Sequence, residues 1–221
     1  MTAIYSIQGK LTSPTALPRL LESARESRAV QERLGANAFR MYTVVMGGAF
    51  TGQFTFTAEF EDAAAVLGFQ DAWDADAGAQ KVMANYMTLD SPVAIESSDL
   101  LVEIDLGTGA PTRAPSAGMA VILTARQGAM DQAIARLADG ASYIRKIGAS
   151  SARLFAYGIG GAQSNMLVQW NEAANQREIG RIVDTFNDPE NAQAMKLRAA
   201  VDEADGPFTS YTTVLVKEIA Y

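Results

Sequence analysis

Two arginines stand at matching positions in a stretch that occurs twice in the chain. Arg40 is the sixth residue of one copy, and Arg153, 113 residues later, is the sixth residue of the other. An arginine can bind a carboxylate or an enolate through paired hydrogen bonds. Tyr42 and Tyr157 lie close to these arginines in the sequence, and a tyrosine hydroxyl can donate a proton to a bound molecule. These four residues are therefore candidates for binding a small molecule.

A structural role explains the same arginines. Each would pair with a carboxylate such as Glu59 or Glu172, which are also 113 residues apart, and would order the sheets without touching a ligand. Trp170 is the last candidate: with Met166 and Val168 it forms an apolar stripe. Such a stripe suits either the wall of a ligand cavity or a packed core. The sequence leaves both roles open for each candidate.

The repeat extends well beyond the arginines. Both copies of the stretch begin with Gly-Ala, carry an aromatic residue at the eighth position, and run into a Gly-Gly-Ala turn. So long a repeat in a chain of 221 residues indicates a duplicated domain. A linker rich in Gly, Pro, Thr and Ser is expected between the halves. The predicted divisions are a first half at 1–106, a linker at 107–118 and a second half at 119–221.

Each half shows the same series of elements. Short stretches of alternating or β-branched residues predict strands, and apolar stripes at helical spacing predict helices. Gly35 and Gly148 follow the first long helix of each half, where a left-handed cap favours glycine. Asp188-Pro189-Glu190 is expected to cap a short helix. The predicted strands are 2–7, 39–45, 53–60, 100–104, 119–125, 151–157, 163–171 and 212–219; the predicted helices are 14–34, one from about 61, 79–86, 127–147, 173–186 and a last one with its N-cap at 188 and its first turn at 189–190.

The order β-α-β-β-α-β forms a four-stranded antiparallel sheet with both helices on one face, the ferredoxin-like arrangement. The other face of the sheet stays uncovered and needs a partner. We therefore predict an α+β fold in which two tandem ferredoxin-like units pack their open faces together as a pseudo-dimeric barrel with a cavity between the sheets. The arginines and tyrosines would face this cavity. The two third strands disagree about which face is apolar, so their inner face stays unassigned.

Composition limits the classes of partner. The formal net charge of −7 and the pI near 4.7 disfavour nucleic acid, because binding phosphates needs clusters of Lys and Arg. There is no basic run suited to an anionic membrane surface. The first residues lack the charged and apolar regions of a signal peptide. We expect a soluble cytoplasmic protein.

The chain contains neither cysteine nor histidine. A thiolate nucleophile, a Ser–His triad, a histidine-based zinc site and an imidazole haem ligand are therefore excluded. Any chemistry must come from Asp, Glu, Lys, Arg, Tyr, Ser or Thr. We expect no metal site and no cofactor.

The duplicated β-α-β-β-α-β unit resembles the dimeric α+β barrel superfamily. That superfamily includes antibiotic-biosynthesis-type monooxygenases, NIPSNAP-like proteins and the haem-bearing chlorite dismutase group. The resemblance covers nearly the whole chain, but it rests on element order and duplication, and no subfamily is assigned. Its haem-binding members and several cyclases and isomerases use a histidine. This chain has none, so those activities are not expected here.

Three functions stay open at the level of the sequence. The first is a protein that binds a small apolar or carboxylate-bearing molecule between its sheets through Arg40, Tyr42, Arg153, Tyr157 and Trp170. The second is a cofactor-independent monooxygenase or isomerase, with a tyrosine as acid or base and an arginine as the anion site. The third is a structural protein that assembles with further copies of itself. Whether any catalysis occurs is left undecided.

Overall fold

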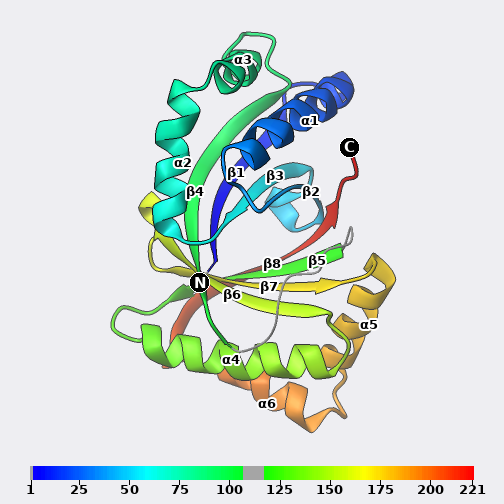
Figure 1. Cartoon of the computed structure of the whole chain (residues 1–221). Helices are drawn as coiled ribbons and strands as arrows, with labels where there is room; N and C mark the ends of the chain where they lie inside the picture. The colour runs from blue at the N-terminus through cyan, green and yellow to red at the C-terminus, as the bar shows by residue number, and fades with distance from the viewer. Residues whose placement is uncertain (1, 107–116) are drawn as a thin grey trace.

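The computed structural model of this protein describes residues 2–106 and 117–221 (Figure 1). Each half contains four strands and three helices in the predicted order. In the first half these are β1 (Ala3–Leu11), α1 (Leu17–Arg33), β2 (Ala38–Met46), β3 (Gln53–Phe60), α2 (Ala63–Ala75), α3 (Ala77–Tyr86) and β4 (Val93–Ile104). In the second they are β5 (Ala117–Ala125), α4 (Met130–Lys146), β6 (Ser151–Ile159), β7 (Met166–Ala173), α5 (Gln176–Asn187), α6 (Ala192–Val201) and β8 (Phe208–Glu218).

The eight strands close into one barrel in the order β1-β3-β2-β8-β5-β7-β6-β4. Each half supplies a four-stranded antiparallel sheet, and the antiparallel ladders β2–β8 and β4–β6 join the two sheets. Figure 1 shows α1, α2 and α3 on the outside of one sheet and α4, α5 and α6 on the outside of the other. The predicted α+β barrel of two ferredoxin-like units is confirmed, and both units belong to one chain.

The long helices end at glycine in both halves, as predicted. Gly35 has a φ of +107° and Gly148 a φ of +124°, a region that residues with a Cβ rarely adopt. The amide of Ala36 donates to the carbonyl of Gln31, and the amide of Ala149 donates to that of Ile144. In each half this hydrogen bond belongs to a Schellman motif, which closes the last turn of the helix and directs the chain toward β2 or β6.

The helix starts also repeat, with one correction. Asp62 caps α2 by accepting from the amide of Ala65, and Asn175 caps α5 in the same way. The prediction that Asp188 caps the last helix was wrong. The Asn191 side chain caps α6 instead, because Pro189 and Glu190 form a turn that delays the first helical residue to Ala192.

The inner face of the third strands, which the sequence left open, is the same in both halves. Thr55 and Thr57 of β3 and their counterparts Val168 and Trp170 of β7 point into the barrel. The alternate residues face the helices: phenylalanines on β3, but leucine, glutamine, asparagine and alanine on β7. The apolar content of β3 is therefore concentrated on its helix side, whereas that of β7 lies largely inside the barrel.

The fourth strands are longer than predicted. β4 begins at Val93, because it pairs with β1 along its whole length despite the polar run in its middle. Gly9 makes this possible, since a Cβ there would lie 2.5 Å from the carbonyl oxygen of Ala94. Of the predicted linker, residues 107–116 lie outside the described residues, and residues 117 and 118 belong to β5.

Candidate functional site

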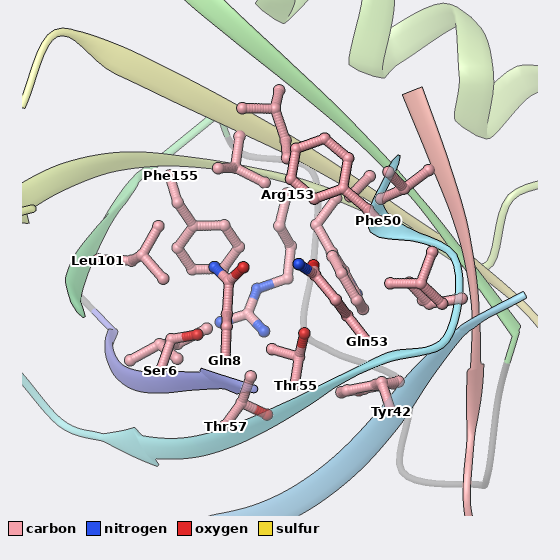
Figure 2. A pocket seen from close by; sticks show the side chains of 18 of the residues that line it. Ser6, Gln8, Tyr42, Phe50, Gln53, Thr55, Thr57, Leu101, Arg153 and Phe155 are labelled. Carbon is pink, nitrogen blue, oxygen red and sulfur yellow. The ribbon is translucent and has the colours of Figure 1, made fainter. Parts of the chain in front are cut away.

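Four of the five predicted site residues surround a cavity inside the barrel, here called the barrel cavity. It has a volume of about 100 Å³, and Tyr42, Arg153, Tyr157 and Trp170 are among the residues that line it. Figure 2 shows Arg153 and Tyr42 among its lining residues. Trp170 packs edge-on against Tyr42, with ring centroids 5.0 Å apart. The structure thus brings together residues that the sequence placed on different strands.

The guanidinium of Arg153 is bound to two carboxylates. Its Nε lies 2.8 Å from Oε1 of Glu103 and its Nη2 3.0 Å from Oε2, while its Nη1 lies 3.0 Å from Oε1 of Glu59. The side chain is only 3% exposed and lies over the ring of Phe155. Burial lowers the pKa of Arg153, but the hydrogen bonds and charges of Glu103 and Glu59 outweigh it and raise this pKa above its usual value.

Arg40 occupies the matching position in the other sheet. Its Nη1 lies 3.3 Å from Oε1 of Glu172 and 3.8 Å from Oε2 of Glu218, and it also donates to the hydroxyl of Tyr42. Each arginine therefore reaches a third-strand glutamate of the opposite half. The ion-pair explanation that the sequence left open is the arrangement that the structure shows for both arginines.

These contacts limit what the barrel cavity can bind. Two arginines stand among four glutamates in the two clusters, Glu59, Glu103, Glu172 and Glu218. Of these charged residues, Arg153, Glu59 and Glu172 line the cavity, and Arg153 is already bound by Glu59 and Glu103, so an added carboxylate finds no free cation in the described lining.

Burial, the largest effect, and the charge of Glu172 raise the pKa of Tyr42. Burial and the charge of Asp99 raise that of Tyr157 to about 12. At neutral pH both phenols are protonated and can only donate or accept hydrogen bonds.

A second and larger cavity lies outside the barrel wall, in the helix layer of the second half. We call it the α6 cavity. It has a volume of about 380 Å³ and lies between the outer face of β5, β7 and β8 and the helices α4, α5 and α6. Met119, Leu123 and Leu137 are buried apolar residues of its lining. Its size falls in the range of small-molecule sites, whereas the barrel cavity falls below it.

The α6 cavity is larger than its counterpart in the first half, which is lined by more aromatic rings. The matching cavity under α1, α2 and α3 has a volume of only about 70 Å³. The register of β2 with β3 matches that of β6 with β7 at a spacing of 113 residues, so each position on these strands has a defined counterpart. Three rings that line the small cavity are replaced: Phe39 by Ala152, Phe56 by Gln169 and Phe69 by Ile182.

Polar groups lie at the floor of the α6 cavity. Gln169 and Asn171 are 6% and 0% exposed. Nε2 of Gln169 donates to Oδ1 of Asn171 at 3.0 Å, and Nδ2 of Asn171 donates to the carbonyl of Met119 at 3.3 Å. Gly140 of α4 stands opposite, since a Cβ there would lie 3.5 Å from Oε1 of Gln169. A glycine at this position keeps the space above the amides open.

The helical wall of the α6 cavity carries three cations and two carboxylates, those of Asp139 and Asp202. Arg136 pairs with Glu203 at 3.2 Å, and both side chains are largely exposed. Lys196 is exposed. Arg198 is half-buried; its Nη1 donates to Oδ1 of Asn187 at 3.5 Å, and its Nε is buried without a hydrogen-bond partner among the described residues. Arg198 is thus a cation with hydrogen-bonding capacity to spare.

Sequence reasoning did not single out Gly140, Gln169, Asn171 or Arg198. The signal that could have found them is the comparison of the two halves, position by position. Where a large apolar residue under the helices of the first half corresponds to a small or polar residue in the second half, the second half gains space or polarity. That comparison needs the register of both halves, which the structure supplies.

Metal and haem sites find no support in the residues present. Within residues 2–106 and 117–221, no cluster of potential ligands could hold a metal ion. The chain has no histidine or cysteine to serve as an axial haem ligand, so we derive no step through haem. None of the helices in the described part of the chain has the length and apolar character needed to span a bilayer.

Comparisons with known proteins give matches in structure alone. No protein-family model matches the sequence, and no curated protein matches it significantly. A proposed monooxygenase from Lactobacillus acidophilus NCFM is similar over 99% of this chain and 94% of its own, with a TM-score of 0.60 and 9% identity. A second proposed monooxygenase, from Fusobacterium nucleatum, is similar over 99% and 93%, with a TM-score of 0.63 and 5% identity.

Chlorite dismutase from Candidatus Nitrospira defluvii is also similar, over 98% of this chain and 90% of its own, with a TM-score of 0.56 and 9% identity. The chain has the dimeric α+β barrel fold. The likeness covers both halves, so this dimeric α+β barrel is built from a single chain with an internal duplication. At such low identity the neighbours establish the fold and leave the function to the residues of this chain.

Proposed function

We propose that this protein binds a small, mainly apolar molecule in the α6 cavity. The observation that carries the proposal is the difference between the halves: about 380 Å³ of space under the helices of the second and about 70 Å³ under those of the first. On β7 the ring of Phe56 is replaced by Gln169, which lines the α6 cavity, and the space left has the size and mixed lining of a ligand site.

The barrel cavity is the less favourable place. The expectation of a ligand between the sheets rested on Arg40, Tyr42, Arg153, Tyr157 and Trp170. Both arginines are engaged by glutamates, and about 100 Å³ leaves room for only a very small molecule. We infer that these five residues mainly join the two sheets. The role that remains for the barrel cavity is to bind a small neutral ligand beside Tyr157.

An oxygenase that acts on the bound molecule is the second candidate. The Gln169–Asn171 amide pair favours it, because buried amides can orient a hydroxyl or carbonyl of a substrate. Two fold neighbours are proposed monooxygenases, which adds only an analogy of fold. Uptake of oxygen that occurs only when a phenolic substrate is added, and only in protein whose α6 cavity is open, would support this candidate.

Filling the cavity tests the proposal. The neutral fluorescent dye N-phenyl-1-naphthylamine is titrated into the wild type and into Gly140→Leu, in which a larger side chain stands in the lining of the cavity with its Cβ in contact with Oε1 of Gln169. We expect at least about a tenfold weaker dye affinity in Gly140→Leu, since about 1.5–3 kcal/mol of apolar burial is lost to the ligand. Gly140→Ala, which leaves most of the space, is expected to bind nearly as well as the wild type.

The matched control is Gly180→Leu. Gly180 is also a helical glycine, but it lies on the exposed side of α5 and outside the cavity lining. A Cβ added there would meet no other atom of the described residues within 4 Å. This variant should bind the dye like the wild type. Equal dye affinity in Gly140→Leu and Gly180→Leu would show that the dye binds elsewhere and would refute the proposed site.

A further inference from the structure

We propose that the molecule bound in the α6 cavity carries a carboxylate or a similar anionic group, and that Arg198 binds this group. The inference rests on the function proposed above and names the class of its ligand: an amphipathic acid, with its apolar body over the sheet and its acidic end toward α6.

The hydrogen bonding of Arg198 is incomplete among the described residues. Its Nε is buried without a partner, and no carboxylate among residues 2–106 and 117–221 lies within ion-pairing distance of it. The paired arginine of the same wall, Arg136, is by contrast largely exposed and bound to Glu203. A buried donor on a charged group destabilises the protein until an acceptor reaches it. A carboxylate is the acceptor that suits a guanidinium best.

The corresponding residue of the first half supports this assignment. Helices α3 and α6 are each capped by an acidic or amide side chain, Asp76 and Asn191, and the seventh residue after each cap lines the local cavity. In α3 that residue is Met83, beside the small cavity; in α6 it is Arg198, beside the large one. The second half therefore has a cation beside the large cavity, and the first half has a methionine at the corresponding position beside the small one.

The rest of the cavity fits the same kind of molecule. Met119, Leu123 and Leu137 offer apolar contact to a hydrocarbon body. Oε1 of Gln169, whose Nε2 is bound to Asn171, offers one acceptor for a hydroxyl of the ligand. Arg153, the cation in the described lining of the barrel cavity, is already bound by Glu59 and Glu103, so the barrel cavity offers a carboxylate no free cation among the described residues.

The test uses two ligands that differ only in their head group. Sodium decanoate and decan-1-ol are titrated against wild-type protein carrying N-phenyl-1-naphthylamine, and the loss of dye fluorescence gives the affinity of each. We expect decanoate to displace the dye at a concentration at least about tenfold lower than decan-1-ol, because the alcohol lacks the negative charge and the second oxygen with which a carboxylate binds a guanidinium.

Arg198→Met gives the chain the residue of its own first half. We expect this variant to bind decanoate at least about tenfold more weakly while it still binds decan-1-ol and the dye, which also shows that it folds. Arg198→Lys keeps the charge without the Nε donor and should restore part of the preference for decanoate. Arg177→Met removes an exposed arginine of α5 outside the cavity lining and should leave the preference intact.

The outcomes separate this inference from the function on which it rests. Dye binding that is lost in Gly140→Leu, together with equal affinity for decanoate and decan-1-ol, would keep the α6 cavity as the site and overturn the anionic ligand. A preference for decanoate that persists in Arg198→Met would overturn the role of Arg198. A dye affinity unaffected by Gly140→Leu would refute the proposed site itself.

Discussion

We expect the ion pairs of Arg153 with Glu59 and Glu103 to be among the largest contributions that charged residues make to the stability of the fold. In Arg153→Met the apolar part of the side chain is kept, but Glu59 and Glu103 lose the cation that they share. Removing one partner of a buried ion pair costs about 3–5 kcal/mol, because the remaining charge is left uncompensated. For a chain of this size that corresponds to a fall in Tm of about 6–20 °C.

An exposed ion pair with an equally short contact provides the control. Arg28 lies 2.7 Å from Glu32, but both side chains are about half exposed. Arg28→Met is therefore expected to cost no more than about 0.5 kcal/mol. Urea denaturation at pH 7 measures both variants. In the triple variant Arg153→Met, Glu59→Gln, Glu103→Gln, where no charge is left, we expect most of the lost stability to return.

Two results would refute this reasoning. A cost below about 1 kcal/mol for Arg153→Met would mean that water or rearrangement solvates the two carboxylates in the barrel. A triple variant as unstable as the single one would mean that the loss came from packing against Phe155, and that the uncompensated charge contributed little.

Two further predictions concern pH. Burial raises the pKa of Tyr157 to about 12, whereas an unfolded tyrosine titrates near 10, so the stability that its neutral form contributes is complete below pH 10 and is lost between pH 10 and 12. Urea denaturation at pH 9, 10 and 11 should therefore show a shallower decline in Tyr157→Phe, by up to about 1.4 kcal/mol per pH unit; a parallel decline would contradict the assignment. Burial also raises the pKa of Asp99, with an opposing hydrogen bond from Ser97, so its ionisation destabilises the fold as pH rises. Asp99→Asn should accordingly unfold at higher urea concentration than the wild type at pH 7 and at the same concentration near pH 3, and a less stable variant at pH 7 would refute this.

Much of the architecture could be predicted from local signals. The repeat at 113 residues, the glycines after the first helices and the alternation within strands are properties of neighbouring residues. They were sufficient to predict two ferredoxin-like units that form a barrel. The cap of α6 could not be predicted in the same way, because Asp188 and Asn191 are both good capping residues and the turn between them decides which one is used.

The candidate site depended on tertiary structure for a different reason. The sequence identified Arg40 and Arg153 and offered glutamates as their alternative partners, but only closure of the barrel brings Glu172 to Arg40 and Glu59 to Arg153. Those contacts cross between the halves, so no local pattern contains them.

The sequence by itself determined that the chain is duplicated and that its chemistry must do without cysteine and histidine. Only the tertiary structure showed that the two halves differ in the space beneath their helices. The residues that line the α6 cavity come from separate elements, from Met119 on β5 to Arg198 on α6, and each of them signals little alone. Their combined effect is a volume, and a volume exists only when strands and helices are packed together.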